Sequence, residues 1–263
     1  MARSARASGS ARPSEEIHIE GLATPVEVRR HPAARRMTLR VSRTRRSVVV
    51  TLPMSCDLQQ AGRFLSSHID WVRERLVAVP EPQPFRDGGL IPLRGEPHRI
   101  RFEGPVRGPA VRVAAATACA TDRHPLILVR GHLDHAPRRL AAWLTCEARR
   151  DLEARVAFHA GRLAVRYGRL TVRDQSSRWG SCSSNGNLSF SWRLIMAPTL
   201  VLDYVAAHEV AHLREMNHGR RFWALVAQTM PAMAEARRWL DVYGLDLHRY
   251  GMIEGDEVDL VAD

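Results

Sequence analysis

Lysine is absent from this chain of 263 residues, so all 39 of its basic side chains are arginine. The chain has 28 acidic residues, which leaves a formal net charge of +11 at pH 7. Guanidinium groups bind phosphates and carboxylates well, so one expectation is an anionic ligand or a nucleic acid. The alternative is a solvated basic surface without a specific partner, because a bias in composition can also favour arginine.

Cysteine is scarce too, and its four copies stand far apart: Cys56, Cys119, Cys146 and Cys182. No two of them form a Cys-x-x-Cys pair, which argues against a disulfide framework and against a four-cysteine zinc site. We expect most of them to be small buried side chains.

Long apolar runs are also missing. No stretch approaches the roughly 18 consecutive apolar residues of a membrane-spanning helix. The basic N-terminus lacks the apolar core of a secretory signal, although its arginine and serine content also resembles a mitochondrial presequence. We expect a cytoplasmic protein with no membrane partner, a disordered basic tail over residues 1–15 and an acidic tail over residues 251–263.

Hydrophobic residues make up 45% of the chain, enough for a core, and their pattern divides the chain in two. Residues 16–135 are β-rich, with one amphipathic helix beginning after Asp57, a suitable N-cap residue. Residues 136–250 begin with a long helix that runs to about Tyr167. No internal repeat is evident. We expect strands at 25–31, 37–43, 47–53, 90–95, 98–102 and 126–129. The first three of these strands should pair antiparallel.

Residues 204–223, YVAAHEVAHLREMNHGRRFW, contain the strongest chemical signal. Pro198 marks a helix start, and on that helix His208 and His212 are four residues apart, which places them one above the other on the same face. Glu209 is rotated by about 100° from His208, so it is better placed to reach a metal-bound water than to bind the metal. This HExxH pattern supplies two metal ligands and one general base.

A third histidine, His218, follows six residues after His212. Asn217 and Gly219 flank it, and both residue types tolerate the turn that would return the chain to the metal. Glu215 and Glu235 are alternative third ligands. Three imidazoles suit one zinc ion. The competing interpretation is a histidine cluster on an amphipathic helix, and Phe222 and Trp223 are expected to be core residues.

Upstream, residues 175–194 read QSSRWGSCSSNGNLSFSWRL, in which Asn-Gly predicts a hairpin between strands at 171–179 and 188–196. Such a hairpin could offer an edge to an extended substrate, or could simply pack on the metal helix. Arg178 could hold a substrate carboxylate or phosphate, or form a structural ion pair, and Trp179 is a candidate substrate contact or core residue. Tyr204, one turn before His208, is a candidate hydroxyl donor. Cys182 lacks an evident activating base.

These motifs together, SRWGSCSSNGNLSFSWRL, YVAAHEVAHL and NHGRRFW, resemble the YgjP-like metallopeptidase family, and more distantly the SprT group of metalloproteases. The resemblance covers about residues 21–250. It implies an α+β protein whose β-rich N-terminal region precedes a zincin-like C-terminal domain, with the hairpin and the HExxH helix in that domain. It also implies that His208, His212 and His218 are the zinc ligands and that Glu209 is the catalytic glutamate.

Three functions are compatible with these residues. The first is a zinc metallopeptidase in which Glu209 activates water to cleave a peptide or protein substrate. The second, which some relatives of this type suggest, is a metal-dependent nucleoside triphosphate pyrophosphatase acting on UTP. The third is a DNA-associated or structural zinc module. Glu209 argues against the third, because a structural site needs a fourth ligand and no adjacent carboxylate.

Overall fold

The computed structural model describes residues 15–19, 22, 24–41, 47–77, 81–115, 123–175 and 177–251, and shows a mixed α+β protein. The tails expected at the two ends fall almost wholly outside these residues. The chain forms two compact units, Met1–Pro80 and Glu81–Asp263. The division predicted from the sequence lay after residue 135. The structure groups the strands of 90–130 with the later helices because they share one hydrophobic core.

The first unit contains a four-stranded sheet of β1 (Glu15–Ile17), β2 (Val26–Arg30), β3 (Thr38–Val41) and β4 (Val48–Leu52), in the order β1-β2-β4-β3. β2 and β4 pair in parallel, so the expectation of antiparallel pairing was wrong for these two strands. β3 pairs antiparallel with β4 from its other side. Along the chain β3 follows β2, but in the sheet β4 lies between them. β2 and β4 therefore run in the same direction, and β3 runs opposite to both.

The single helix expected after Asp57 is two helices, α1 (Leu58–Ser66) and α2 (Ile69–Val77). Asp57 is the N-cap of α1 as expected, and its carboxylate accepts a hydrogen bond from the backbone N–H of Gln60 at 2.7 Å. The break follows Ser66, where the Ser67 hydroxyl donates to the carbonyl of Phe64. This side-chain bond competes with the helical ladder. The two helices and the sheet share a core of Val26, Val28, Val48, Val50, Leu52, Ala61, Leu65, Val72 and Leu76.

The second unit starts with another four-stranded sheet, formed by β5 (Leu90–Leu93), β6 (Glu96–Gly104), β7 (Val111–Ala114) and β8 (Leu126–Arg130). Its order is β5-β6-β8-β7, with β6 parallel to β8 and both outer pairs antiparallel. This is the arrangement of the first sheet. The chain therefore repeats a strand topology that its sequence does not reveal.

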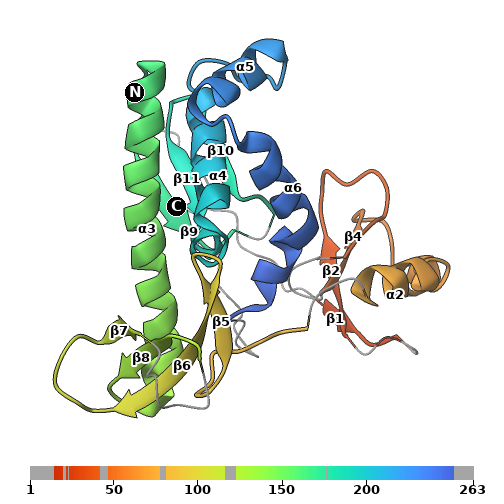
Figure 1. Ribbon diagram of the computed structural model, residues 1–263. Coiled ribbons are helices and arrows are strands. Elements are labelled where there is room, and N and C mark those ends of the chain that lie inside the picture. The colour runs from red at the N-terminus through yellow and green to blue at the C-terminus, as the bar shows by residue number, and fades with distance from the viewer. Residues whose placement is uncertain are drawn as a thin grey trace, which may run out of the picture. The chain divides into compact units, whose positions relative to one another are not determined.

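After the short 3-10 helix η1 (Leu133–His135), the long helix α3 (Ala136–Leu163) forms as expected, with Pro137 in its first turn. It passes through Gly161 and ends at Ala164, whose backbone is left-handed with φ of 50°. Figure 1 shows α3 (green) lying alongside α4 (Thr199–Ala211), the helix that carries the histidine motif. No helix among the described residues is long and apolar enough to span a membrane.

A third sheet precedes α4. It consists of β9 (Leu170–Arg173), β10 (Gly180–Cys182) and β11 (Leu188–Ser191), in the order β10-β11-β9. The Asn-Gly hairpin is present, and Gly186 in its turn has φ of 75°. Its two arms are β10 and β11, whereas the expected first arm at 171–179 is mostly β9 and a connecting loop. β9 pairs with β11 in parallel. The expected second arm is also shorter, because residues 192–196 form the 3-10 helix η2 (Trp192–Met196).

The remaining elements are α5 (Arg220–Thr229), α6 (Met233–Tyr243) and the 3-10 helix η3 (Gly244–Arg249). Arg193, of which 4% is exposed, ties η3 to the rest of the unit. Its guanidinium pairs with Asp174 at 3.0 and 3.1 Å and donates to the backbone carbonyls of Leu247 and Tyr250.

Candidate metal centre

Helix α4 is held from several sides. Pro198 is its N-cap residue, and the helix ends at His212, the C-cap, so His208 and Glu209 lie in its last turn. Almost every residue between Val201 and Ala211 is buried. The helix packs against α3, α5, α6, β10 and η2. A helix buried on all sides presents its polar groups only where the surrounding structure leaves room for them.

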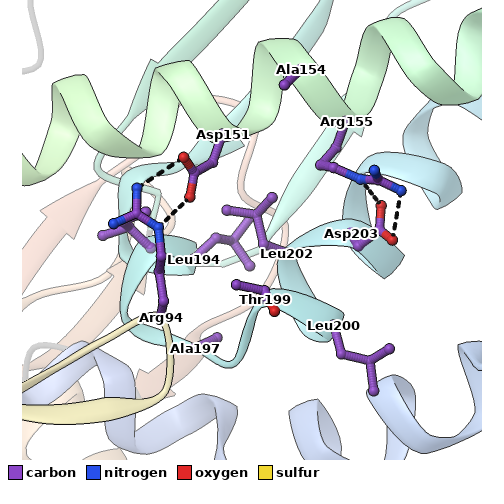
Figure 2. Close-up of a pocket in the computed structure, with 11 residues that line it drawn as sticks. Arg94, Asp151, Ala154, Arg155, Leu194, Ala197, Thr199, Leu200, Leu202 and Asp203 are labelled. Carbon is purple, nitrogen blue, oxygen red and sulfur yellow. Dashed lines mark hydrogen bonds and ion pairs between the residues drawn. The ribbon is translucent and has the colours of Figure 1, made fainter.

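Two ion-pair groups join α3 to neighbouring segments around the start of α4. Arg94, in the β5–β6 turn, binds Asp151 with two hydrogen bonds of 2.7 and 2.9 Å and also binds Glu147 at 2.9 Å. Asp203 on α4 pairs with Arg155, and it lies 2.7 Å from Nε2 of the fully buried His159. Figure 2 shows the Arg94 and Arg155 pairs on opposite sides of a cavity of about 430 Å³.

Asp203 is ionised in its group with Arg155 and His159. Burial by itself would raise the pKa of Asp203, but hydrogen bonds from His159 and Arg155 outweigh that effect and lower the pKa. The carboxylate is therefore ionised at neutral pH, and each of its partners comes from α3. Together these contacts fix α4 relative to α3 one turn before the histidines begin.

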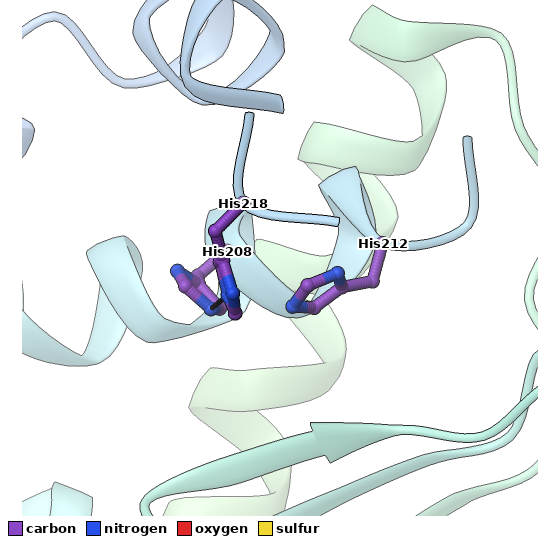
Figure 3. Close-up of side chains that lie close together, drawn as sticks. All are labelled: His208, His212 and His218. Atoms are coloured by element: carbon purple, nitrogen blue, oxygen red, sulfur yellow. Dashed lines mark hydrogen bonds between the residues drawn. The ribbon is translucent and has the colours of Figure 1, made fainter. Parts of the chain in front are cut away.

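The three histidines meet at the C-terminal end of α4 (Figure 3). His218 lies in the loop that precedes α5, and its Nε2 is 3.0 Å from Nε2 of His208. One ligand atom from each of His208, His212 and His218 lies within 4.8 Å of the other two. No other group of three or more His, Cys, Asp or Glu with this spacing occurs among the described residues. The alternative ligands Glu215 and Glu235 are not in the group.

The loop that returns His218 uses no left-handed residue. Among the described residues, non-glycine backbones with positive φ occur only at Arg94 and Ala164, so Asn217 needs no special conformation. Gly219 is the N-cap of α5 with φ of −83°. The unusual backbone conformation that was expected of Asn217 and Gly219 is therefore not present. Instead, Glu215 accepts a hydrogen bond on its carbonyl from Nδ1 of His212 at 3.1 Å.

Phe222 has a larger part in the site than its sequence suggested. It is fully buried, as expected of a core residue, yet its ring centroid lies 4.5 to 4.8 Å from the centroids of all three histidine rings. Trp223 stacks on His218 at 5.9 Å and an interplanar angle of 29°. In the sequence, only the position of Phe222 and Trp223 on the helix directly after His218 could have indicated that they contact the histidines. These rings limit the orientations open to the histidines.

His208 and His212 are in the protonation state that metals need. Burial lowers the pKa of His208 to about 4, with further lowering from His212, His218 and Arg237. Burial also lowers the pKa of His212, against the effect of its hydrogen bond to Glu215. Neutral imidazoles offer a lone pair to a metal ion. The bond from Nδ1 of His212 leaves Nε2 as the free ligand atom, an arrangement typical of metal-binding histidines.

These residues fit a zinc ion. Zinc binds imidazole nitrogens at about 2.0–2.1 Å with tetrahedral geometry, which needs donors a few ångströms apart, as they are here. With only three protein ligands, one position is left for water or substrate, as in catalytic rather than structural sites.

Glu209 lies next to the ligands, and only 5% of it is exposed. Burial raises its pKa to about 8, and the positive charge of Arg178 opposes that rise. A carboxyl group whose pKa lies near neutrality can both accept and release a proton during turnover. Its neighbour on β10 is Gly180: a Cβ added there would stand 2.6 Å from both Cγ and Oε1 of Glu209. No sequence pattern indicated this contact between Gly180 and Glu209.

The three candidate substrate contacts lie in different surroundings. Arg178 is exposed, and no described residue pairs with it, so a structural ion pair finds no support there. The Trp179 ring lies 4.8 Å from the ring of His248 and also contacts Gly244, both in η3. Tyr204 is buried beside His208, with ring centroids 5.9 Å apart. Burial raises the pKa of Tyr204, which keeps its hydroxyl protonated and able to donate.

Cys182 is half-buried on β10. Burial raises the pKa of its thiol, and the nearby charge of Glu209 raises it further. The thiolate needed for nucleophilic attack is therefore disfavoured.

Comparison with known proteins identifies the family of the chain. The family described as "YgjP-like, metallopeptidase domain" matches residues 35–243. No curated protein matches the chain. Among solved structures, the crystal structure of the metallopeptidase zymogen of Pyrococcus abyssi abylysin matches with 19% identity and a TM-score of 0.33, over 38% of this chain and 99% of that chain. Because the family match covers well over half of its residues, the chain belongs to the YgjP-like metallopeptidase family.

Proposed function

We propose that this protein is a zinc-dependent metallopeptidase that cleaves extended or unfolded peptides. The observation that carries the proposal is the group of three histidine ligands with the buried Glu209 beside it. Membership of the family supports a metal-dependent hydrolase, for which zinc is the typical metal.

Strand β10 supplies the place for an extended substrate. It is at the edge of its sheet, since β11 pairs with only one of its sides and β9 lies beyond β11. Its three residues are half-buried, and Gly180 among them touches Glu209. An extended peptide can add to such an edge through backbone hydrogen bonds, which bind without strong dependence on side chains. That binding mode would bring the peptide backbone beside Glu209.

Each polar residue then has a role. Zinc, when bound to the three histidines, supplies a Lewis acid and lowers the pKa of water. Glu209 takes the proton released as water attacks and delivers it to the departing amine. The Tyr204 hydroxyl and the Arg178 guanidinium are the donors available for the charge that develops on the carbonyl oxygen. Burial of Glu209 keeps competing water away from the proton that it carries.

A nucleoside triphosphate, UTP in particular, is the second candidate substrate. The observation in its favour is Arg178, an exposed guanidinium without a described partner near Glu209, which suits a phosphate as well as a carboxylate. A structural zinc module or a DNA-associated role is the third candidate, and a buried glutamate beside three ligands is not needed for either.

One panel of substrates separates these functions. Zinc-loaded protein is offered unstructured peptides, casein and nucleoside triphosphates, with Glu209→Gln as the matched control because it keeps the shape of the side chain but cannot accept the proton. We expect peptide cleavage by the wild type, and loss of cleavage with retained zinc in the variant. Full turnover by Glu209→Gln would refute the catalytic role. Hydrolysis of triphosphates alone would replace the peptidase, and tight salt-sensitive DNA binding without hydrolysis would support the third candidate.

A further inference from the structure

A second arginine, Arg237 on α6, stands beside the metal centre, although it is remote from the motifs in the sequence. Its guanidinium carbon lies 5.3 Å from the centre of the Trp223 ring, and that ring stacks on His218 at 5.9 Å. The guanidinium is therefore within about 11 Å of the His218 ring, the sum of these two distances. Since an extended peptide advances about 3.3 Å per residue, this is a reach of about three residues.

The charge of Arg237 is only weakly compensated. Its nearest acidic group is the Asp241 carboxylate, 3.9 Å away, beyond hydrogen-bonding distance. The side chains of Arg237 and Asp241 are 58% and 71% exposed, so water and salt screen the pair. The stacking on Trp223 orients the guanidinium, which reduces the entropy lost when it binds a ligand.

The neighbourhood as a whole has an excess of positive charge. Arg178 is near enough to Glu209 for its charge to lower the pKa of that carboxyl group. The charge of Arg237, on α6, lowers the pKa of both His208 and Tyr204. A divalent ion held by three neutral imidazoles would add two further positive charges, and among the described residues Glu209 is the buried carboxylate that follows His208 directly in the sequence. A substrate that carries a negative charge would restore the balance.

We propose that Arg237 is the receptor for a carboxylate of the substrate, so that the enzyme prefers peptides with a carboxylate within about three residues of the bond that it cleaves. The carboxylate can belong to an Asp or Glu side chain or to a free C-terminus. This selectivity rests on the proposed peptidase function. Arg237 acts on specificity and does not take part in bond cleavage.

The test compares matched peptides. One set has Glu, Gln or Lys near the cleavage site, and a second set ends in a free carboxylate or in an amide. The proteins are the wild type, Arg237→Ala, Arg237→Lys and Asp241→Asn, with Arg238→Ala as a matched control because Arg238 is the exposed neighbour on the same helix. Zinc content is measured for each protein. In parallel, calorimetry measures peptide binding to Glu209→Gln and to Glu209→Gln with Arg237→Ala.

We expect Arg237→Ala to lower kcat/KM for the carboxylate peptides about 10- to 100-fold, the usual effect of losing a charged hydrogen bond, with neutral peptides unchanged. Arg237→Lys should restore part of the loss, and Asp241→Asn should tighten binding of the acidic peptides by removing their competitor. If kcat/KM falls for the Glu peptides, Arg237 binds a side-chain carboxylate; if it falls for the peptides with a free C-terminus, Arg237 binds the terminal carboxylate.

The two proposals fail in different ways. If the zinc-loaded wild type cleaves no peptide, the peptidase function fails, and the calorimetric comparison still decides whether Arg237 binds carboxylates. If peptides are cleaved but the Glu and Gln peptides are equivalent, as are the acid and amide ends, the role of Arg237 is wrong. An equal loss in Arg238→Ala would also overturn it, because general surface charge would then explain the preference.

Discussion

Replacing Gly180 with alanine tests how closely strand β10 is fitted to Glu209. The added Cβ would stand 2.6 Å from Cγ and Oε1 of Glu209 and 2.9 Å from Cδ. Carbon atoms in contact are normally about 3.5–4.0 Å apart, so roughly 1 Å of movement is required. Only 5% of Glu209 is exposed, which leaves its side chain little room to move aside. Gly180 has no left-handed backbone, so the effect is one of space and not of backbone strain.

The expected cost has two parts. Overpacking of this kind usually destabilises a protein by about 1–3 kcal/mol. Displacing a general base by about 1 Å can lower the rate about 100-fold, so we expect kcat for a cleaved peptide to fall by between 10- and 100-fold. The zinc content should stay near one ion per chain, because the alanine does not touch the three histidines. Peptide kinetics, metal analysis and thermal unfolding measure the three quantities.

Gly161→Ala is the matched control, since a Cβ at Gly161 in α3 meets no atom within 4 Å. It should leave kcat unchanged and stabilise the protein by about 0.5–1 kcal/mol, the usual gain for this exchange inside a helix. If Gly180→Ala keeps the full kcat and the stability of the wild type, the close fit between β10 and Glu209 is not what positions that carboxylate.

Three other changes have definite expected outcomes. His212→Ala should lose the bound zinc in metal analysis, and unchanged zinc would refute its assignment as a ligand. Arg193→Ala removes hydrogen bonds to the half-exposed Asp174 and to two backbone carbonyls and should destabilise the protein by about 1.5–3 kcal/mol in denaturant unfolding, whereas Arg173→Ala, an exposed neighbour, should cost little. Burial lowers the pKa of His248 from 6.5 to about 4, with Arg193 lowering it further and Asp174 opposing. Between these two pH values, His248 binds a proton in the unfolded chain but not in the folded chain. The free energy of unfolding should therefore fall as pH drops from 6.5 toward 4, by up to about 3 kcal/mol. His248→Gln should flatten this part of the curve, and an unchanged slope would contradict the assignment.

The sequence predicted the grouping of the three histidines better than the path of the strands. Spacing along one helix placed His208 and His212 together, because four residues make about one turn whatever surrounds them. The position of His218 in the site depended on a loop, yet its distance from His212 was short enough for the loop to return. The long helix α3 and the Asn-Gly hairpin were also predicted, since both depend on local patterns.

What the sequence missed depends on partners that are distant along the chain. Alternation identifies a strand such as β4 but not the neighbour with which it pairs, so β2 and β4 were expected to run in opposite directions. At the break between α1 and α2, the side chains of Ser67 and His68 both bond to the carbonyl of Phe64, which no sequence pattern indicated. The contacts of Phe222 with three imidazoles, of Gly180 with Glu209 and of Arg237 with Trp223 arise only when separate elements pack together.

The repeated strand order also bears on how the chain folds. Val26 pairs with Val48 and Arg99 pairs with Leu126, so each parallel pair closes a loop of fewer than thirty residues instead of requiring a long helical crossover. Short closures cost little entropy and favour rapid folding. Both sheets lie in the first half of the chain, whereas the three histidines lie in its last quarter. During synthesis, strand pairing in both sheets can therefore begin before the three histidines are made, so that any capture of a metal ion by these histidines would be a late step of folding.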